Sequence, residues 1–152
     1  MSFLPMFLRN FVFTQLVKFV NPYSRTIPFK VECYEKGLCM LQMKEQRSIR
    51  NPFQSVHAAA LVLLGETAGG LSLTSALSPK ERFIVKSINA TYYLKSRNTI
   101  LATAKVDTSK LEAIRLKKGK GSIVMDVDIH QHTGKEKLAT IEVDFFVDCT
   151  KI

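Results

Sequence analysis

One stretch of this sequence limits the fold more than any other, because residues 56–68 are apolar around the whole circumference of a helix. A surface helix has one apolar stripe and one polar face, so a helix that is apolar on every side is expected to be buried on every side. Ser55 is a suitable residue to cap the start of this helix, and Gly69-Gly70 is a suitable pair to end it. The sequence therefore predicts a central helix enclosed by the rest of the chain.

Segments of alternating apolar and polar residues lie on both sides of this helix, and this period of two is typical of half-buried strands. Strands are predicted at residues 29–34, 38–45, 83–94, 99–107, 122–130 and 138–149. A capping-box match from Ser109 to Glu112 opens a short basic helix between the fourth and fifth of them. Because 152 residues have room for one domain, we expect a single α+β domain over residues 1–152, organised around the buried helix.

Residues 1–22 predict a further helix in front of the strands. At 100° per residue, one face of this helix is apolar and is formed by Leu8, Val12, Phe13, Leu16, Phe19 and Val20. We expect the helix to pack on or beside the domain through this face. Residues 1–31 contain four basic residues and no acid, a bias that leaves contact with a membrane surface or a targeting role as the alternative.

The chain carries a formal charge of +9, which attracts polyanions in general. Its Lys and Arg residues are scattered and match no nucleic-acid-binding motif, so nucleic acid is not an expected partner. The three cysteines, Cys33, Cys39 and Cys149, have no C-x-x-C spacing and are typical of reduced thiols in an intracellular protein. We expect a cytoplasmic location, with a mitochondrial one as the alternative.

Glu66 is the one acid within the apolar helix. A carboxylate in apolar surroundings loses hydration, which raises its pKa, and buried carboxylates are rare unless they are paired or functional. Glu66 is therefore the first candidate for a catalytic group, and a carboxylate that reaches solvent or a structural Arg is the alternative. His57 and Asn51 are weaker candidates, since a lone His beside apolar residues is more often a core group and Asn51-Pro52 is an ordinary turn sequence.

The spacing of His57 and Glu66 predicts a dimer. Nine residues separate them, so on one helix their side chains point about 180° apart and lie roughly 13 Å apart along the axis. They can meet only if two copies of the helix face each other across a two-fold axis. We therefore expect a homodimer, or a dimer of such dimers, whose sites take His57 from one chain and Glu66 from the other.

Asn51, His57-Ala58-Ala59 six residues later, and Glu66 nine residues after the His form a spaced pattern ahead of four strands. The pattern resembles the hotdog fold, and within it the acyl-CoA thioesterases of the phenylacetate-degradation type, which carry Asn, His-Gly-Gly and an acid at the same intervals. The resemblance covers residues 27–149. The N-terminal helix, the Glu and the hairpin insertion are closer to a hotdog branch of largely unassigned function. The resemblance implies an antiparallel sheet wrapped around the central helix, with an extra amphipathic helix at the N-terminus.

The resemblance also implies roles for these residues. Glu66 would act as a general base on water, or as a nucleophile on the thioester carbonyl. The N–H of Ala58 would donate to the developing oxyanion, and the positive end of the helix would add to that field. Asn51 and His57 would position the thioester or the water from the other subunit.

The sequence departs from the family pattern at Ala58 and Ala59, where the family has two glycines. Alanine keeps the backbone N–H, but its methyl group restricts backbone angles and the approach of a substrate, and it makes the pocket more apolar. We expect a pocket for a medium to long aliphatic acyl chain or an aryl-acyl group. Its expected lining is Ala59, Phe53, Val62, Leu63 and a loop at residues 71–77. The resemblance also implies a hydroxyl near the acid, from Thr74 or Ser75.

A basic cluster is formed by Arg115, Lys117, Lys118 and Lys120, and it suits the phosphates of coenzyme A as well as it suits a solvated face. We expect the partner to be acyl-CoA or a related acyl thioester, with coenzyme A as part of the substrate and with no separate cofactor or metal. An acyl-CoA thioesterase is the first hypothesis. A non-catalytic hotdog protein that binds acyl-CoA or lipid is the second, and the two alanines favour it.

Overall fold

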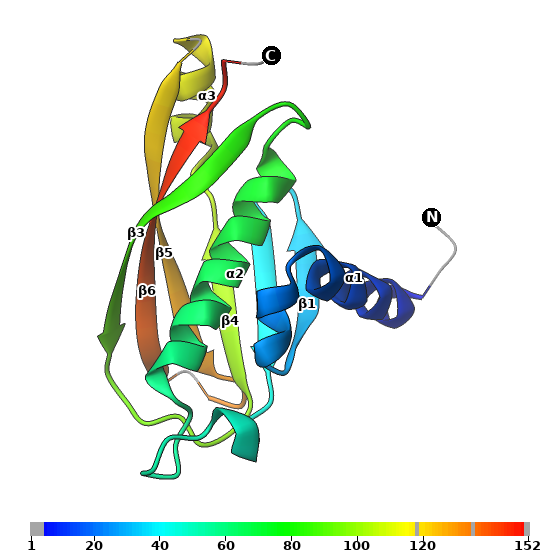
Figure 1. The fold of residues 1–152 in the computed structure, drawn as a ribbon, viewed down its shortest axis with the longest axis vertical. Coiled ribbons are helices and arrows are strands. Elements are labelled where there is room, and N and C mark those ends of the chain that lie inside the picture. The colour runs from blue at the N-terminus through cyan, green and yellow to red at the C-terminus, as the bar shows by residue number, and fades with distance from the viewer. Residues whose placement is uncertain (1–4, 118, 135, 151–152) are drawn as a thin grey trace.

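The computed structural model describes residues 5–117, 119–134 and 136–150 (Figure 1). The elements follow one another as α1 (Met6–Val20), η1 (Pro22–Thr26), β1 (Phe29–Glu35), β2 (Leu38–Met43), η2 (Arg47–Ile49), α2 (Ala58–Ala76), β3 (Arg82–Tyr92), β4 (Ile100–Lys105), α3 (Thr108–Leu116), β5 (Lys120–Gln131) and β6 (Lys137–Asp148). Every predicted strand is present, with its ends within two residues of the prediction. The short helix α3 is also present, but Asp107 rather than Ser109 caps it, by accepting a hydrogen bond from the N–H of Ser109.

The six strands form one antiparallel sheet in the order β1-β2-β4-β5-β6-β3. Helix α2 lies along one face of this sheet, and its apolar side chains meet fully buried side chains such as Leu41, Val127 and Ile141 (Figure 1). The predicted arrangement, an antiparallel sheet wrapped around a central helix, is confirmed, and it is the hotdog fold. Strands β1 and β3 form the two edges of the sheet.

The predicted ends of the central helix are wrong at both termini. The helix begins after His57, not Ser55, and it continues through Gly69 and Gly70 to Ala76. Glycine at position 69 serves packing rather than termination, because a Cβ there would lie 3.2 Å from the Phe145 ring. The residues predicted as a loop at 71–77 therefore belong mostly to the last turns of the helix. Although α2 has the length and hydropathy of a membrane span, 56% of that stretch is buried inside the domain.

The predicted N-terminal helix is also confirmed, but its predicted packing face is wrong. Helix α1 packs on β1 through the side that carries Asn10, Thr14 and Val17. The reason is that β1 is an edge strand whose backbone groups need partners. The N–H of Val31 donates to Thr14 Oγ1 at 2.9 Å, and Asn10 Nδ2 donates to the carbonyl of Glu32 at 2.7 Å. Asn10 and Thr14 thus face the sheet. Of the predicted apolar face, Phe13 does pack on the domain, with its ring centroid 4.3 Å from that of Tyr34 in β1. The other members of that face are exposed, namely Leu8, Val12, Leu16, Phe19 and Val20.

Candidate functional site

A cavity of about 440 Å³ lies between α1, α2 and β3. Its lining is largely apolar and is drawn from five elements, with Phe13 and Leu16 from α1, Tyr34 from β1, Leu71 from α2, Phe83 from β3 and Phe145 from β6. Phe83 and Phe145 meet edge to face in this lining, with ring centroids 5.3 Å apart. The second half of α1, from Phe13 to Val20, forms the side of the cavity that faces α2.

Glu66 is the only charged residue among the described residues that line this cavity. Its side chain is half-buried, and partial burial raises the pKa of its carboxyl above the usual range for Glu. Within the described part of the chain, no salt bridge to Glu66 is formed. A carboxylate that is poorly hydrated and without a cation is a stronger base than a solvated one, which suits proton abstraction near neutral pH.

Thr67 is a polar residue of the cavity that the sequence did not indicate. It is buried beside Glu66, and its Oγ1 has no hydrogen-bond partner among the described residues. The hydroxyl oxygen itself is enclosed, so Thr67 borders the cavity through its other atoms. Of the two predicted hydroxyl residues, Thr74 lines the same cavity as Glu66, and its hydroxyl donates to Gly70 O at 2.7 Å. The Ser75 hydroxyl donates to Ser72 O at 2.7 Å, and Ser75 does not line the cavity.

The start of α2 is a second polar centre. His57 caps the helix, and its Nδ1 accepts a hydrogen bond from the N–H of Ala59 at 3.1 Å. The N–H of Ala58, at the first helical position, has no acceptor within the helix and lies at the positive end of the helix dipole. Tyr92, at the end of β3, donates to the carbonyl of Ala58 at 3.4 Å. His57, Ala58 and Ala59 are all exposed, so this centre is open to a ligand.

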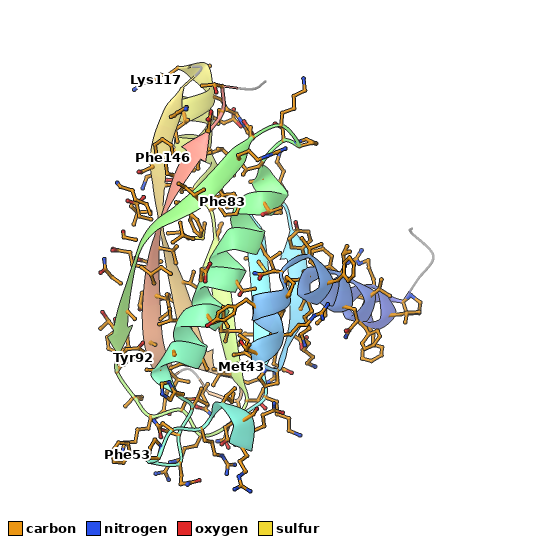
Figure 2. All side chains as sticks on the ribbon, viewed as in Figure 1. Met43, Phe53, Phe83, Tyr92, Lys117 and Phe146 are labelled. Atoms are coloured by element: carbon orange, nitrogen blue, oxygen red, sulfur yellow. The ribbon has the colours of Figure 1, made fainter. Side chains whose placement is uncertain are left out.

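Asn51 lies in the loop before α2, and its side chain is used within that loop. Its Oδ1 accepts hydrogen bonds from the N–H of Phe53 at 2.9 Å and of Ser55 at 3.2 Å, and its Nδ2 donates to Ser55 Oγ at 2.8 Å. The side chains that were predicted to line the acyl pocket lie outside this cavity. Phe53 is exposed at the lower end of the molecule (Figure 2), Val62 is half-buried and Leu63 is part of the core. None of these three lines the cavity that holds Glu66.

The basic cluster predicted to hold phosphates is not a set of free cations. The Arg115 guanidinium donates to both carboxylate oxygens of buried Glu81, to Glu112 and to the Ala76 carbonyl. Lys117 is exposed at the end of α3 (Figure 2), and Lys120 pairs with Asp148 at 3.2 Å. Lys118 lies outside the described residues. Arg115 therefore joins α3 to the end of α2.

The structure does not bring Glu66 and the start of α2 together within one chain. Ala58 and Glu66 are eight residues apart, so roughly 12 Å of helix separates them. Strand β3 connects the two centres along its length (Figure 2). Phe83 and Val85, near its start, line the cavity that holds Glu66, and Tyr92, at its end, contacts Ala58. Within the described residues, no group of three potential metal ligands is present.

Comparisons with known proteins agree with this architecture. The model of DUF4442, a domain of unknown function, matches residues 9–147. No curated protein matches the sequence significantly. A solved Pseudomonas aeruginosa protein of unknown function, described as a probable thioesterase, is 21% identical with a TM-score of 0.80, and the match covers 95% of this chain and 96% of that one.

Two further solved structures are similar to this chain. A thioesterase from Haemophilus influenzae is 18% identical with a TM-score of 0.73, and the match covers 91% of this chain and 89% of that one. A mutant thioesterase from Staphylococcus aureus is 20% identical with a TM-score of 0.70, covering 84% of this chain and 99% of that one. At these identities the likeness shows that the fold is shared.

Proposed function

We propose that this chain, which belongs to the DUF4442 family, is a thioesterase that hydrolyses acyl-CoA or a related acyl thioester with Glu66 as the base. The observation that carries the proposal is the position of Glu66, a half-buried carboxylate without a cation in the wall of an otherwise apolar cavity. Such an acid is costly to keep unless it is used. The fold shared with bacterial thioesterases supports the same activity.

The complete site needs two copies of the chain, and the free edge of β3 offers the surface on which they can pair. Strand β3 ends the sheet order, and no described strand pairs with its outer edge. Antiparallel pairing of β3 with its copy, about a two-fold axis between Ser87 and Ile88, would set Phe83 opposite the partner's Tyr92. Because Phe83 lies near Glu66 and Tyr92 contacts the start of α2, Glu66 would then face the start of the second α2.

The chemistry follows from these two centres. Glu66 takes a proton from a water molecule, and the hydroxyl oxygen attacks the carbonyl carbon of the thioester. The developing oxyanion accepts a hydrogen bond from the N–H of Ala58 of the facing helix, whose positive end stabilises the charge. The carbon–sulfur bond then breaks, and the thiolate recovers the proton from Glu66. The products are a carboxylic acid and free coenzyme A.

The cavity indicates the acyl group. Its volume of about 440 Å³ is within the range of small-molecule sites, roughly 300–1,000 Å³. Apart from Glu66, Thr67, Asn21 and Thr74, the described residues of its lining are apolar or aromatic, or are glycine. A medium to long aliphatic chain, or an aryl-acyl group, would fill such a space and expel its water. Short hydroxylated acyl groups would leave it partly empty.

Binding without hydrolysis is the second candidate function, and one observation favours it. The Asn51 amide is committed to its own loop at both its oxygen and its nitrogen, so it would have to release those hydrogen bonds to position a thioester. A protein of this kind would hold the acyl chain in the cavity and leave the thioester bond intact.

The test is a panel of acyl-CoA substrates, from acetyl to palmitoyl and including phenylacetyl, with free thiol measured over time and binding measured by calorimetry. Hydrolysis is expected to be fastest with the longer aliphatic or aryl-acyl members. Binding of the same members with no thiol release would overturn the hydrolase assignment in favour of the binding protein. Neither binding nor release across the panel would contradict both.

A further inference from the structure

The outward face of α1 is apolar and uncovered. At 100° per residue, Leu8, Val12 and Phe19 point within about 40° of one another, on the side opposite the residues that contact β1. Phe11 and Leu16 extend this face, and the side chain of Phe19 is 73% exposed. Helix α1 projects from the β1 side of the domain (Figure 1), so within the described chain nothing shields the face from its surroundings.

This exposure is built into the way that α1 is attached. Asn10 and Thr14 must face the sheet because they satisfy backbone groups at the edge of β1. The apolar residues on the other side are thereby held outward and cannot turn in without breaking those hydrogen bonds. Contiguous exposed apolar surface of this kind ordinarily marks an interaction site. The attachment therefore presents the face at a fixed orientation.

The charge around this face indicates what covers it. The first 31 residues contain four basic residues and no acid, and the whole chain carries +9. Lys18 lies over the Phe29 ring and Lys30 pairs with Glu32. Arg9 on α1 and Arg25 just after it are exposed and form no salt bridge within the described residues. Exposed aromatic and aliphatic residues beside basic ones are the features of a helix that lies in the headgroup region of an anionic bilayer. A protein partner would need a matching acidic and apolar groove, whereas an anionic lipid surface provides both components at once.

We propose that the α1 outer face, formed by Leu8, Phe11, Val12, Leu16 and Phe19, docks this protein on an anionic lipid surface. The rim of the cavity is continuous with this face, because Leu16 is 52% exposed and Val20 is 74% exposed and both line the cavity. A docked protein would thus hold its cavity entrance against the bilayer, where apolar acyl chains partition. Docking does not depend on hydrolysis, so it stands or falls separately from the thioesterase assignment.

Vesicle co-sedimentation tests the proposal. The intact protein is mixed with vesicles of phosphatidylcholine alone or of phosphatidylcholine with phosphatidylglycerol, at low and high salt. Binding is expected to the anionic vesicles and to weaken as salt is raised. The double variant Phe11→Ser/Phe19→Ser should bind at least about tenfold more weakly, since two apolar side chains are lost from the interface.

Phe53→Ser is the matched control, because Phe53 is as exposed as Phe19, 73% in each case, but lies far from α1. Its binding should equal that of the wild type, and circular dichroism should show that all variants keep the fold. An equal loss of vesicle binding in Phe11→Ser/Phe19→Ser and in Phe53→Ser would overturn the proposal. A wild-type protein that does not bind anionic vesicles would overturn it as well. It is also overturned if the wild type forms assemblies larger than a dimer that Phe11→Ser/Phe19→Ser dissociates, since a second copy then covers the face.

Discussion

Arg115 donates to both carboxylate oxygens of Glu81, at 2.7 Å from Nε and 2.6 Å from Nη2. Glu81 is only 4% exposed, and these hydrogen bonds lower the pKa of its carboxyl to about 2. Arg115 also donates to the last residue of α2, Ala76, at 2.9 Å. One guanidinium thus holds together α3, the end of α2 and the turn that leads into β3.

Arg115→Ala should therefore be a stability mutation rather than a binding mutation. Removing the cation leaves a buried carboxylate without its partner, which costs about 3 kcal/mol of the free energy of unfolding. Urea denaturation at neutral pH measures this loss, and Lys117→Ala, an exposed residue of the same segment, should change the midpoint little. An Arg115→Ala protein of wild-type stability with a raised KM for acyl-CoA would instead return Arg115 to the phosphate-binding role.

The same ion pair predicts how stability depends on pH. Because the pKa of Glu81 is about 2 when folded and near 4.5 as a free group, the folded state binds fewer protons between these values. The stabilisation is complete above about pH 4.5 and is lost as the pH falls toward 2. Wild type and Arg115→Ala should therefore converge in unfolding free energy through this window. A constant difference down to pH 2 would show that the charge pair is not the cause.

Gly65 and Gly70 should respond in opposite ways to alanine. A Cβ at Gly65 would lie 2.6 Å from the Ile141 side chain, whereas one at Gly70 would make an ordinary contact at 3.7 Å with Phe83. Gly65→Ala should destabilise by about 1–3 kcal/mol through overpacking, although alanine itself favours the helix. Gly70→Ala should be neutral or stabilise by about 0.5–1 kcal/mol. Thermal unfolding of both variants measures this, and equal effects would contradict the close packing of α2 on β6.

The sequence predicted the central helix, its acid and the strands, because an all-apolar run and an alternating apolar-polar pattern are both visible in the order of the residues. The end of the helix was not, because Gly69 as a stop signal and Gly69 as a point of close packing against Phe145 look identical in sequence. The packing face of α1 was missed for a related reason. Asn10 and Thr14 look like solvent-facing residues until the edge of β1 is known to need their hydrogen bonds.

The candidate site was predictable only in part. Glu66 stood out as an acid in an apolar run, but Thr67 and Tyr92 carry no such signal, since a Thr in a helix and a Tyr in a strand are ordinary. Their relevance depends on tertiary neighbours, namely the cavity for Thr67 and the carbonyl of Ala58 for Tyr92. Arg115 was grouped with its neighbouring lysines because its partner Glu81 lies 34 residues away in the chain.

Ala58→Pro removes the oxyanion donor and little else. Ala58 occupies the first helical position, where proline is well tolerated, and His57 already has the extended backbone (φ −64°, ψ 136°) that a following proline requires. The variant should fold with unchanged thermal stability and lose roughly 10²–10³-fold in kcat. Hydrolysis at the wild-type rate would exclude the Ala58 N–H as the donor.

Mixing two inactive variants tests whether the site is shared between chains. If Glu66 of one chain works with Ala58 of the other, a dimer of one Glu66→Gln chain and one Ala58→Pro chain contains one intact site. Random mixing should then restore about a quarter of the wild-type activity, because half of the dimers are mixed and each has one working site. A mixture that stays as inactive as its components, with subunit exchange shown by mass spectrometry, would place both groups in one chain's site.

The pH dependence of hydrolysis reports the state of Glu66. A general base must be ionised, so kcat/KM should rise with pH through the pKa of Glu66 in the free enzyme. Because burial raises that pKa, the midpoint of the rising limb should lie above the usual range for a solvated Glu. Thiol release measured across the acidic to neutral range gives the midpoint. A limb at the ordinary Glu value would mean that the base is solvated.

The rate of thiol release by Glu66→Gln, compared with the wild type on the best acyl-CoA of the panel, tests the central claim most directly. The amide matches the carboxylate in shape and removes a partly desolvated charge, so the variant should fold and keep its oligomeric state. We predict a fall in kcat of roughly 10²–10⁴-fold with binding of the acyl-CoA largely retained. Hydrolysis by Glu66→Gln at the wild-type rate would contradict the assignment of Glu66 as the base.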